Sequence, residues 1–364
     1  MPGQPTPPPT TTGLVSSSPP KGSPQKSPSP SSPAQGAAEG AIEHIDEQED
    51  DADSAIGSDD AASSTASISS SIVEYRTIRG RTYHSEKFNT DYYAPNDDRQ
   101  SESMDITHHY LMLLLDNKLF LAPLKDNIES VLDVATGTGI WAIDFADEYP
   151  NAEVVGTDLS PIQPSWVPPN VKFELEDATQ TWTFPHDHFD FIHIRYLFGS
   201  VQDWNALFKE AYRHCKPGGW IQSCEIDPPF YSDDGSVDDD YGIQTWNELV
   251  REGGKRTGRS FCVVEEGLQV PGIKATGFVD IQEANYKVPV GSWAKDTHLR
   301  EVGQFLRSTM ENDAEGYTTL LWSQVMAWPQ EEYQVFMMAF RKALKNKKYH
   351  GYMKLRYVWA RKPE

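Results

Sequence analysis

The feature that most constrains this chain is the run Val131–Gly139, in which an apolar segment leads directly into a turn that contains glycine. The apolar part predicts a buried strand, and Gly137 and Gly139 predict a turn where the backbone can approach a ligand, because they carry no side chain. A helix opening at Ile140 would direct its unpaired amides toward the same place. A second strand ends at Asp158, which could accept hydrogen bonds from the two hydroxyls of a ribose. The sequence therefore predicts a nucleotide-type cofactor site.

Two kinds of cofactor fit this pattern, because a nicotinamide dinucleotide fold also carries an acid about 20 residues beyond its glycines. Asp133 favours S-adenosylmethionine, since a carboxylate before the turn suits an ammonium group and repels a pyrophosphate. A strand-like run at 171–175 leads to Asp177 and Ala178, where the acid can reach the exocyclic amine of adenine. A dinucleotide site has no particular need of that acid.

The next segments complete the pattern. Residues 189–194 predict another strand, a helix ends before the Lys-Pro-Gly-Gly turn at 216–219, and 221–225 predict a buried strand. In this order and spacing, the chain from Val131 to Glu225 resembles the class I S-adenosylmethionine-dependent methyltransferases. Their pattern has a further glycine where this chain has Ala135.

A narrower resemblance rests on three segments. Residues 132–141, Arg79-Gly80-Arg81-Thr82-Tyr83-His84 and Tyr93-Ala94-Pro95-Asn96-Asp97 are similar to those of the fungal LaeA-like methyltransferases, a group of regulators and biosynthetic enzymes of secondary metabolism. The resemblance implies an α/β fold with a Rossmann-like seven-stranded sheet, whose last strand runs antiparallel, and helical cap insertions. It also implies that S-adenosylmethionine is held by Asp133, Ala135, Thr136, Gly137, Gly139, Asp158, Leu159, Asp177 and Ala178.

Composition divides the chain into three parts. Residues 1–70 contain no aromatic residue of the Phe, Trp or Tyr type and carry ten acids against two lysines, so we expect a disordered Ser/Pro-rich tail. Five Ser-Pro steps in it are possible phosphorylation sites, although a plain solubilising tail explains them equally well. Residues 71–130 are expected to cover the cofactor site, and 131–364 to form the methyltransferase core.

The second half of the chain predicts the cap. Asp227-Pro228-Pro229-Phe230 is expected to begin a polar loop, followed by a helix at 241–253 and a strand at 279–290. Helices at about 299–348 would form an insertion over the pocket before a last strand at 352–360. Its large apolar side chains are expected mostly in the core, with some lining the pocket: Trp322, Met326, Trp328, Tyr333, Phe336, Met337, Met338 and Phe340.

No residue is assigned as a catalytic base. A helix expected at 103–121 carries His108 and His109, of which at most one can face the pocket, because adjacent helical side chains point about 100° apart. Methyl transfer needs positioning above all, and a base only if the acceptor must lose a proton. The candidates with suitable chemistry are His84, His109, His193, Arg195 and Tyr196.

The net charge and the cysteine content limit which binding partners and which cellular compartment can be expected. A net charge of −22 argues against binding to a nucleic-acid backbone, and the three cysteines have no metal-binding spacing and fit a reducing intracellular compartment. No segment is long and apolar enough to predict a membrane span. The basic residues between Arg341 and Lys348 are either a nuclear import signal or, more simply, a solvated helix face. We therefore expect a protein of the nucleus, the cytoplasm or both.

The predicted activity leaves three roles open. The first is a regulator of secondary metabolism or development that acts with protein partners, which the tail with its Ser-Pro steps favours. The second is a biosynthetic methyltransferase that acts on a small metabolite, which the aromatic cap favours. The third is a scaffold that binds the cofactor without catalysis, which the intact set of Asp133, Asp158 and Asp177 disfavours.

Overall fold

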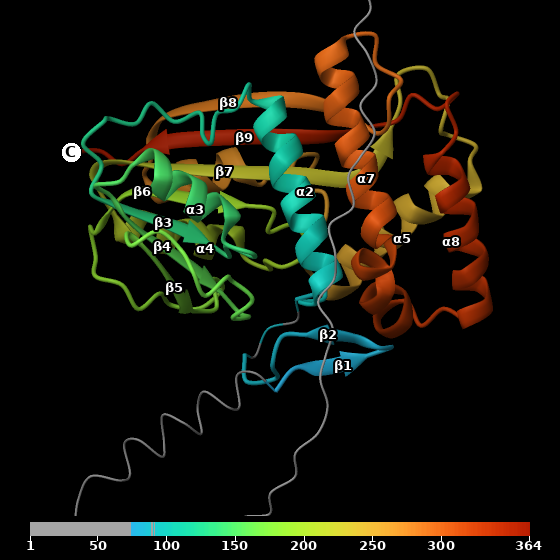
Figure 1. Ribbon diagram of the computed structural model, residues 1–364, viewed down its shortest axis with the longest axis horizontal. Helices are drawn as coiled ribbons and strands as arrows, with labels where there is room; N and C mark the ends of the chain where they lie inside the picture. The colour runs from blue at the N-terminus through green and yellow to red at the C-terminus, as the bar shows by residue number, and fades with distance from the viewer. Residues whose placement is uncertain (1–73, 89, 91) are drawn as a thin grey trace, which may run out of the picture. The chain divides into compact units, whose positions relative to one another are not determined.

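The computed structural model describes residues 74–88, 90 and 92–364, so the predicted tail of residues 1–70 lies outside the described part. A seven-stranded sheet has the order β5-β4-β3-β6-β7-β9-β8 (Figure 1). Its strands are β3 (Ser130–Val134), β4 (Glu153–Asp158), β5 (Val171–Leu175), β6 (Phe189–Arg195), β7 (Cys215–Tyr231), β8 (Val279–Pro289) and β9 (Tyr352–Arg361). A separate hairpin joins β1 (Arg76–Ile78) to β2 (Arg81–Tyr83).

The direction of the strands confirms the predicted fold class. The five adjacent strands β5, β4, β3, β6 and β7 are parallel to one another. Strand β9 lies between β7 and β8 and is antiparallel to both. The chain reverses its direction of travel across the sheet at β3, because β4 lies on one side of it and β6 on the other. In an open α/β sheet, ligands bind where the strand order reverses, outside the carboxyl ends of the strands.

Helices cover both faces of the sheet and the edge at which its parallel strands have their carboxyl ends. They are α2 (Asp98–Leu114), α3 (Ile140–Glu148), α4 (Trp204–His214), α5 (Tyr241–Thr257), α6 (Gln269–Thr276), α7 (Thr297–Leu320), the π-helical turn η1 (Leu321–Val325) and α8 (Gln330–Leu344). α3 packs on β4 and β5, whereas α4 and α6 pack together against β7, β8 and β9. Figure 1 shows α2, α5, α7 and α8 beyond the carboxyl ends of the parallel strands, where α2 packs on α7 and α5 packs on α8.

Alternation along β3 divides the core between the two faces of the sheet. Val131 packs in a cluster with Trp141 and Phe145 of α3, while Leu132 packs in the larger cluster on the other face. Successive side chains of a strand point to opposite faces, so a strand that is buried on both sides must be apolar almost throughout. Within β3 the exceptions are Ser130 at its start and Asp133 near its end, both of which are buried.

Three predicted boundaries were wrong. The helix expected at 103–121 begins at Asp98, because the side chain of Asp97 accepts a hydrogen bond from the Gln100 amide and caps the helix, and it ends at Leu114. The polar loop expected from Asp227 begins only after Tyr231, because Asp227 belongs to the last part of β7, and the strand expected at 221–225 is the middle of this longer strand. Asp227 is fully buried there, and its carboxylate accepts hydrogen bonds from the amides of Val264 and Glu265 at 2.9 and 2.8 Å. A buried acid is tolerated at that position because the backbone satisfies it.

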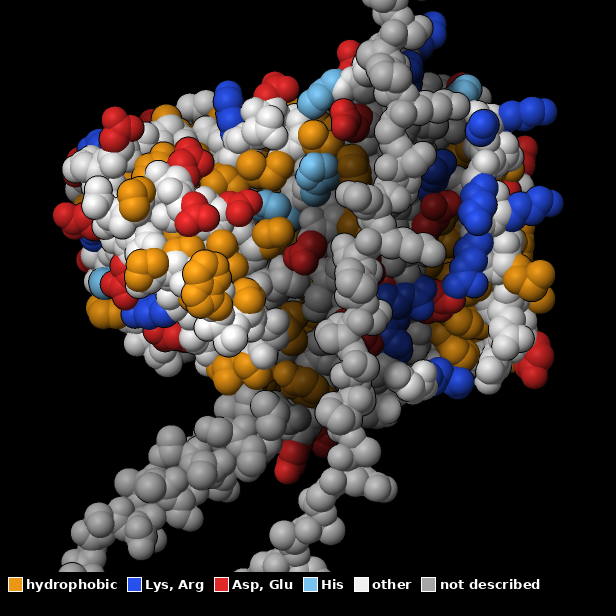
Figure 2. Space-filling model, in the orientation of Figure 1, with side chains coloured by type: hydrophobic (Ala, Val, Ile, Leu, Met, Phe, Trp, Pro, Cys, Tyr) orange, Lys and Arg blue, Asp and Glu red, His pale blue; other side chains and the backbone are white. Residues whose placement is uncertain are grey.

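The last turn of α8 and the residues that follow it carry the basic residues that the sequence singled out. Arg341, Lys342, Lys345, Lys347 and Lys348 are all exposed, and Figure 2 shows Lys and Arg side chains gathered over this helix. Among the described residues, no helix is long and apolar enough to cross a membrane. The same part of the chain holds no group of three or more His, Cys, Asp or Glu that could bind a metal ion.

Candidate active site

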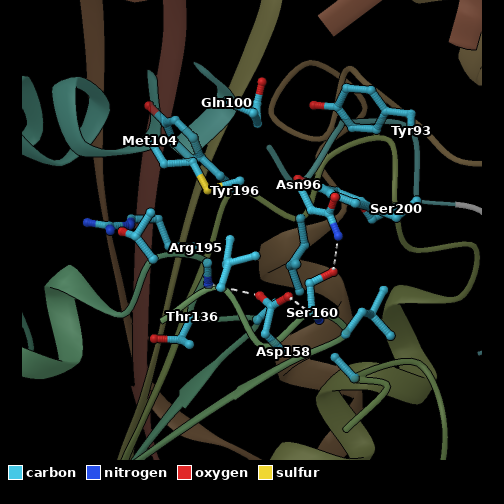
Figure 3. Close-up of a pocket in the computed structure, with 18 of the residues that line it drawn as sticks. Tyr93, Asn96, Gln100, Met104, Thr136, Asp158, Ser160, Arg195, Tyr196 and Ser200 are labelled. Carbon is cyan, nitrogen blue, oxygen red and sulfur yellow. Dashed lines mark hydrogen bonds between the residues drawn. The ribbon is translucent and has the colours of Figure 1, made fainter. Parts of the chain in front are cut away.

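A cleft of about 1270 Å³, part of it open to solvent, lies at the carboxyl ends of β3, β4 and β6. The turn after β3 and the residue that ends β4 form one wall, and the amino end of α2 lies across from Asp158 (Figure 3). Eight of the nine residues predicted to hold a cofactor line this cleft: Asp133, Ala135, Thr136, Gly137, Asp158, Leu159, Asp177 and Ala178. The structure therefore brings them together in one place.

Asp158 is held in position by backbone amides. Its carboxylate oxygens accept from the amide of Gly137 at 2.9 Å and from that of Ser160 at 3.1 Å. Burial raises the pKa of Asp158 to about 6, although these amide hydrogen bonds act in the opposite direction. A half-buried carboxylate fixed in this way is a strong acceptor for hydroxyl donors that reach it from the cleft.

Asp133 is more enclosed than the sequence suggested. It is 3% exposed, one carboxylate oxygen lies 2.8 Å from Nδ1 of His193, and the other accepts from Oγ1 of Thr136 at 2.5 Å. His193 in turn stacks on Trp141 of α3, with ring centroids 3.8 Å apart. Both oxygens of Asp133 thus have partners within the protein, and its main effect is to hold the turn.

The two glycines of the turn have different surroundings. Both Gly137 and Gly139 have positive φ angles, of 62° and 80°, which a residue with a side chain adopts only under strain. A Cβ atom on Gly139 would lie 2.3 Å from the ring of Phe173, so this glycine allows close packing onto β5. A Cβ atom on Gly137 would lie 3.0 Å from Sδ of Met104, across the cleft. Gly137 therefore keeps the cleft open, whereas Gly139, which does not line it, supports the turn.

The other end of the cleft is formed after β5. Asp177 is buried, and its Oδ1 accepts from the amide and the hydroxyl of Thr179 at 2.9 and 2.7 Å, which fixes the loop. Leu159 and Ala178 line the cleft beside it and give apolar contact surfaces. An acid next to apolar surfaces is the arrangement that a purine with an exocyclic amine requires.

The structure separates the five candidates for catalysis. His84 is buried beside Arg76, its Nε2 2.7 Å from that guanidinium, and His109 is exposed with its ring against Phe305. His193 is buried beneath the turn, where desolvation lowers its pKa. None of these three histidines lines the cleft, whereas Arg195 and Tyr196 both do.

A second, smaller chamber adjoins the cleft. Tyr93, Thr107, Tyr196, Phe198 and Tyr317 line both cavities and form the boundary between them. Beyond this boundary the chamber has an almost entirely apolar wall: Tyr110, Ile226, Pro228, Trp246, Val250, Phe261, Leu306, Thr309, Met310 and Met353. Among its described lining residues, none carries a charge at neutral pH.

The hydroxyl groups of Tyr196, at the boundary, and Tyr110 of α2, just inside the chamber, share a hydrogen bond. Tyr196 has a positive φ angle of 59°, a strained conformation for a large side chain. Burial raises the pKa of both phenols far above the ordinary value. Both phenols are neutral at pH 7, so they can orient a methyl acceptor by hydrogen bonding but cannot act as bases at this pH.

Reasoning from the sequence placed residues 71–130 over the cofactor site, but it missed most of the chamber and the individual residues of α2 that line the cleft. The large apolar residues at 322–340 were expected mostly in the core, and most of them are buried there, but none of them lines either cavity and Met338 is 72% exposed. α5 and the middle of α7 form the wall instead. The segment 93–97, noted only for its resemblance, brings Tyr93 and Asn96 to the cleft. Gln100, Met104 and Thr107 follow at helical spacing, which is the one signal that could have placed them on one face.

The strand order and the strand-end site together define a class I S-adenosylmethionine-dependent methyltransferase. A family model described as a methyltransferase domain matches residues 106–260. Methyltransferase pytC of Aspergillus terreus is 36% identical over 305 residues, which are 84% of this chain and 93% of that protein.

Two further relatives are named for regulation or for a protein substrate. Secondary metabolism regulator LAE1 of Cochliobolus heterostrophus is 34% identical, over 78% of this chain and 94% of that protein. Protein-methionine methyltransferase laeA of Emericella nidulans is 30% identical, over 80% of this chain and 77% of that protein. This chain belongs to the LaeA-like family of methyltransferases.

Proposed function

We propose that this methyltransferase acts on a small, largely apolar acceptor that occupies the chamber beside the cofactor cleft. The observation that carries the proposal is the shared boundary at Tyr93, Thr107, Tyr196, Phe198 and Tyr317, because methyl donor and acceptor must meet there. An apolar wall with a few polar groups at its mouth is typical of sites for small molecules.

The residues around the cleft fit the cofactor. S-adenosylmethionine, when bound, supplies a methyl group already activated by a sulfonium. Asp158 would accept from the ribose hydroxyls, Asp177 with Ala178 would contact the adenine edge, and Leu159 one adenine face. Gly137 leaves the room that the cofactor needs, since a Cβ atom there would meet Met104.

The chain contributes orientation rather than proton transfer. Tyr196 and Tyr110 would hold a polar group of the acceptor at the boundary, and apolar side chains such as Trp246 would keep water from its other end. Correct placement alone can supply a large part of the rate enhancement of a bimolecular reaction. Arg195, which lines the cleft and lies 3.2 Å from Nδ1 of His108, is available to pair with a carboxylate of the cofactor.

A substitution that fills the chamber tests the proposal. In Val250→Phe, the larger ring should occupy acceptor space, so methyl transfer to extracted metabolites should fall by about tenfold or more while cofactor affinity stays nearly constant. Val335→Phe, on an exposed site of α8, is the matched control. Formation of S-adenosylhomocysteine measures transfer, and titration calorimetry measures affinity. Equal turnover in the wild type and Val250→Phe would contradict an acceptor in this chamber.

A regulatory role with protein partners, in the nucleus, is the second candidate. It is supported by the names of the LAE1 and laeA relatives and by the Ser-Pro steps of the tail. Affinity capture of the full chain from fungal nuclear extract tests it, since only a regulator should form a stable complex. A methionine-containing peptide belongs in the transfer assay, because the laeA relative is named for that acceptor. Cofactor binding without transfer to any acceptor would favour the scaffold.

A further inference from the structure

Two side-chain oxygens at the amino end of α2 are buried without a hydrogen-bond partner among the described residues. They are Oδ1 of Asn96, a residue 8% exposed, and Oε1 of Gln100, a residue 2% exposed. A buried acceptor without a partner destabilises a folded protein, so each such case calls for an explanation. Both residues line the cofactor cleft. The molecule that fills the cleft is therefore the natural source of their missing partners.

The two residues lie at different places along the cleft. The Nδ2 amide of Asn96 donates to Oγ of Ser160 at 3.0 Å, and Ser160 donates its backbone amide to Asp158, so Asn96 belongs to the ribose side (Figure 3). Gln100 is a hydrogen-bond neighbour of the Tyr317 hydroxyl. Because Tyr317 lines both the cleft and the chamber, Gln100 lies at the boundary where the transferred methyl group must sit.

The other hydrogen-bond acceptors of the cleft indicate which part of the cofactor Gln100 can contact. Under the proposed function, on which this inference rests, Asp158 serves the ribose and Asp177 the adenine. Asp133 is occupied on both oxygens by Thr136 and His193. Asp133 is thus directed largely into the turn, and the unpaired Oε1 atom of Gln100 is a further acceptor available to the positively charged end of S-adenosylmethionine.

We propose that Gln100 is a specificity-determining residue that recognises the sulfonium of S-adenosylmethionine. Its Oε1 atom would accept weak C–H···O hydrogen bonds from the carbon atoms attached to the positive sulfur, which that charge polarises. S-adenosylhomocysteine has the same size elsewhere but no positive charge, so it gains much less from this oxygen. The arrangement favours binding of the methyl donor and release of the spent product.

Calorimetric titration of the full chain with S-adenosylmethionine and with S-adenosylhomocysteine tests the role. Gln100→Met keeps the length of the side chain and removes the oxygen. It should weaken the affinity for S-adenosylmethionine by about threefold to tenfold and that for S-adenosylhomocysteine by less than about twofold. The ligand-free variant should melt at the same temperature as the wild type or higher, because it no longer buries an unpaired acceptor. Gln304→Met, the same change on an exposed site of α7, should alter neither affinity.

The remaining outcomes would overturn the proposal in different ways. Equal weakening of both ligands would assign Gln100 to a part of the cofactor that they share, and a lower melting temperature with equal weakening would make it a structural residue. Unchanged affinity for both ligands would remove it from the site. A wild-type chain that binds neither ligand would refute the proposed function and this inference together, whereas the other outcomes overturn only the role of Gln100.

Discussion

The cofactor cleft and the acceptor chamber are adjacent, yet they are built in different ways. Most of the cleft wall comes from residues 133–201, a continuous part of the chain in which the strands β3, β4, β5 and β6 lead into turns and polar residues. The chamber is assembled from α2, the loop after β6, β7, α5, α7 and β9, which are far apart in the sequence. The backbone positions the first set of groups, whereas packing between helices positions the second.

This difference suggests how the two cavities should respond to change. Residues of the cleft are held by backbone hydrogen bonds of the strand ends, so a single substitution should remove a defined interaction with the cofactor. Residues of the chamber are held in place by packing against one another. Substitutions there should therefore change the binding of the methyl acceptor without changing the affinity for the cofactor. The following experiments test that separation, from the largest expected effect to the smallest.

Gly137→Val should have the largest effect on the cleft. The new side chain would extend toward Met104, and the positive φ angle of Gly137 would add strain, so cofactor binding should become undetectable by calorimetry. The free energy of unfolding should fall by about 1–2 kcal/mol. Gly267→Val is the matched control, because Gly267 also has a positive φ angle but nothing within 4 Å of an added Cβ atom. Retained binding in Gly137→Val would mean that the cofactor lies elsewhere.

Glu225 should make the stability of the chamber wall depend on pH. It is fully buried and accepts from the amides of Leu197 and Phe198 at 3.1 and 3.0 Å, next to the boundary residues. Burial raises the pKa of Glu225 to about 8. A raised pKa in the folded state means that its contribution is complete below the ordinary pKa of a glutamate and is lost as the pH rises through 8.

The wild type should therefore lose about 2–4 kcal/mol of stability relative to Glu225→Gln between pH 5 and pH 9. Urea unfolding of both proteins at several pH values measures the difference, and any titration common to both proteins cancels. A difference that stays constant over this range would show that Glu225 does not titrate there. Asp158 and Asp227, each with a pKa raised to about 6, act in the same direction at lower pH.

Asp158→Ala should have a smaller effect, seen mainly in cofactor binding, although it also removes the acceptor of the Gly137 and Ser160 amides. The loss of two hydrogen bonds to the ribose should weaken binding by about 1.5–3 kcal/mol. In the wild type, affinity should increase as the pH rises through about 6, since the ionised carboxylate is the better acceptor. Asp190→Ala is the control, because this acid holds the amides of Glu129 and Ser130 at the opposite end of β3. Calorimetry that found equal affinity for the wild type and Asp158→Ala would contradict the assignment.

His109→Ala should have the smallest effect. His109 is exposed and contacts Phe305 through its ring, so the free energy of unfolding should change by less than about 0.5 kcal/mol. Neither cofactor affinity nor methyl transfer should change. A large loss of activity in this variant would show that the α2 region rearranges around bound ligands and would weaken the separation of the two cavities.

The cofactor side of this protein was predictable because its signals are local. The apolar run ending at Asp133, the glycines after it and the strands ending at Asp158 and near Asp177 follow rules that operate over a few residues. The parallel sheet then gathers strand ends at one edge without further information. The sequence alone therefore determined the fold class, the place of the cofactor cleft and eight of its lining residues.

Only the tertiary structure decided the acceptor side. Helical spacing can identify an apolar face, but not whether that face meets the core or a cavity. Some aromatic residues of α8 were therefore expected at the pocket, where none lies, and Trp246 of α5 was not. The partners of a buried polar group are likewise invisible in the sequence. Asp133 is occupied by His193 from another strand, and Gln100 is left unpaired, because contacts between distant segments are fixed only when the whole chain packs.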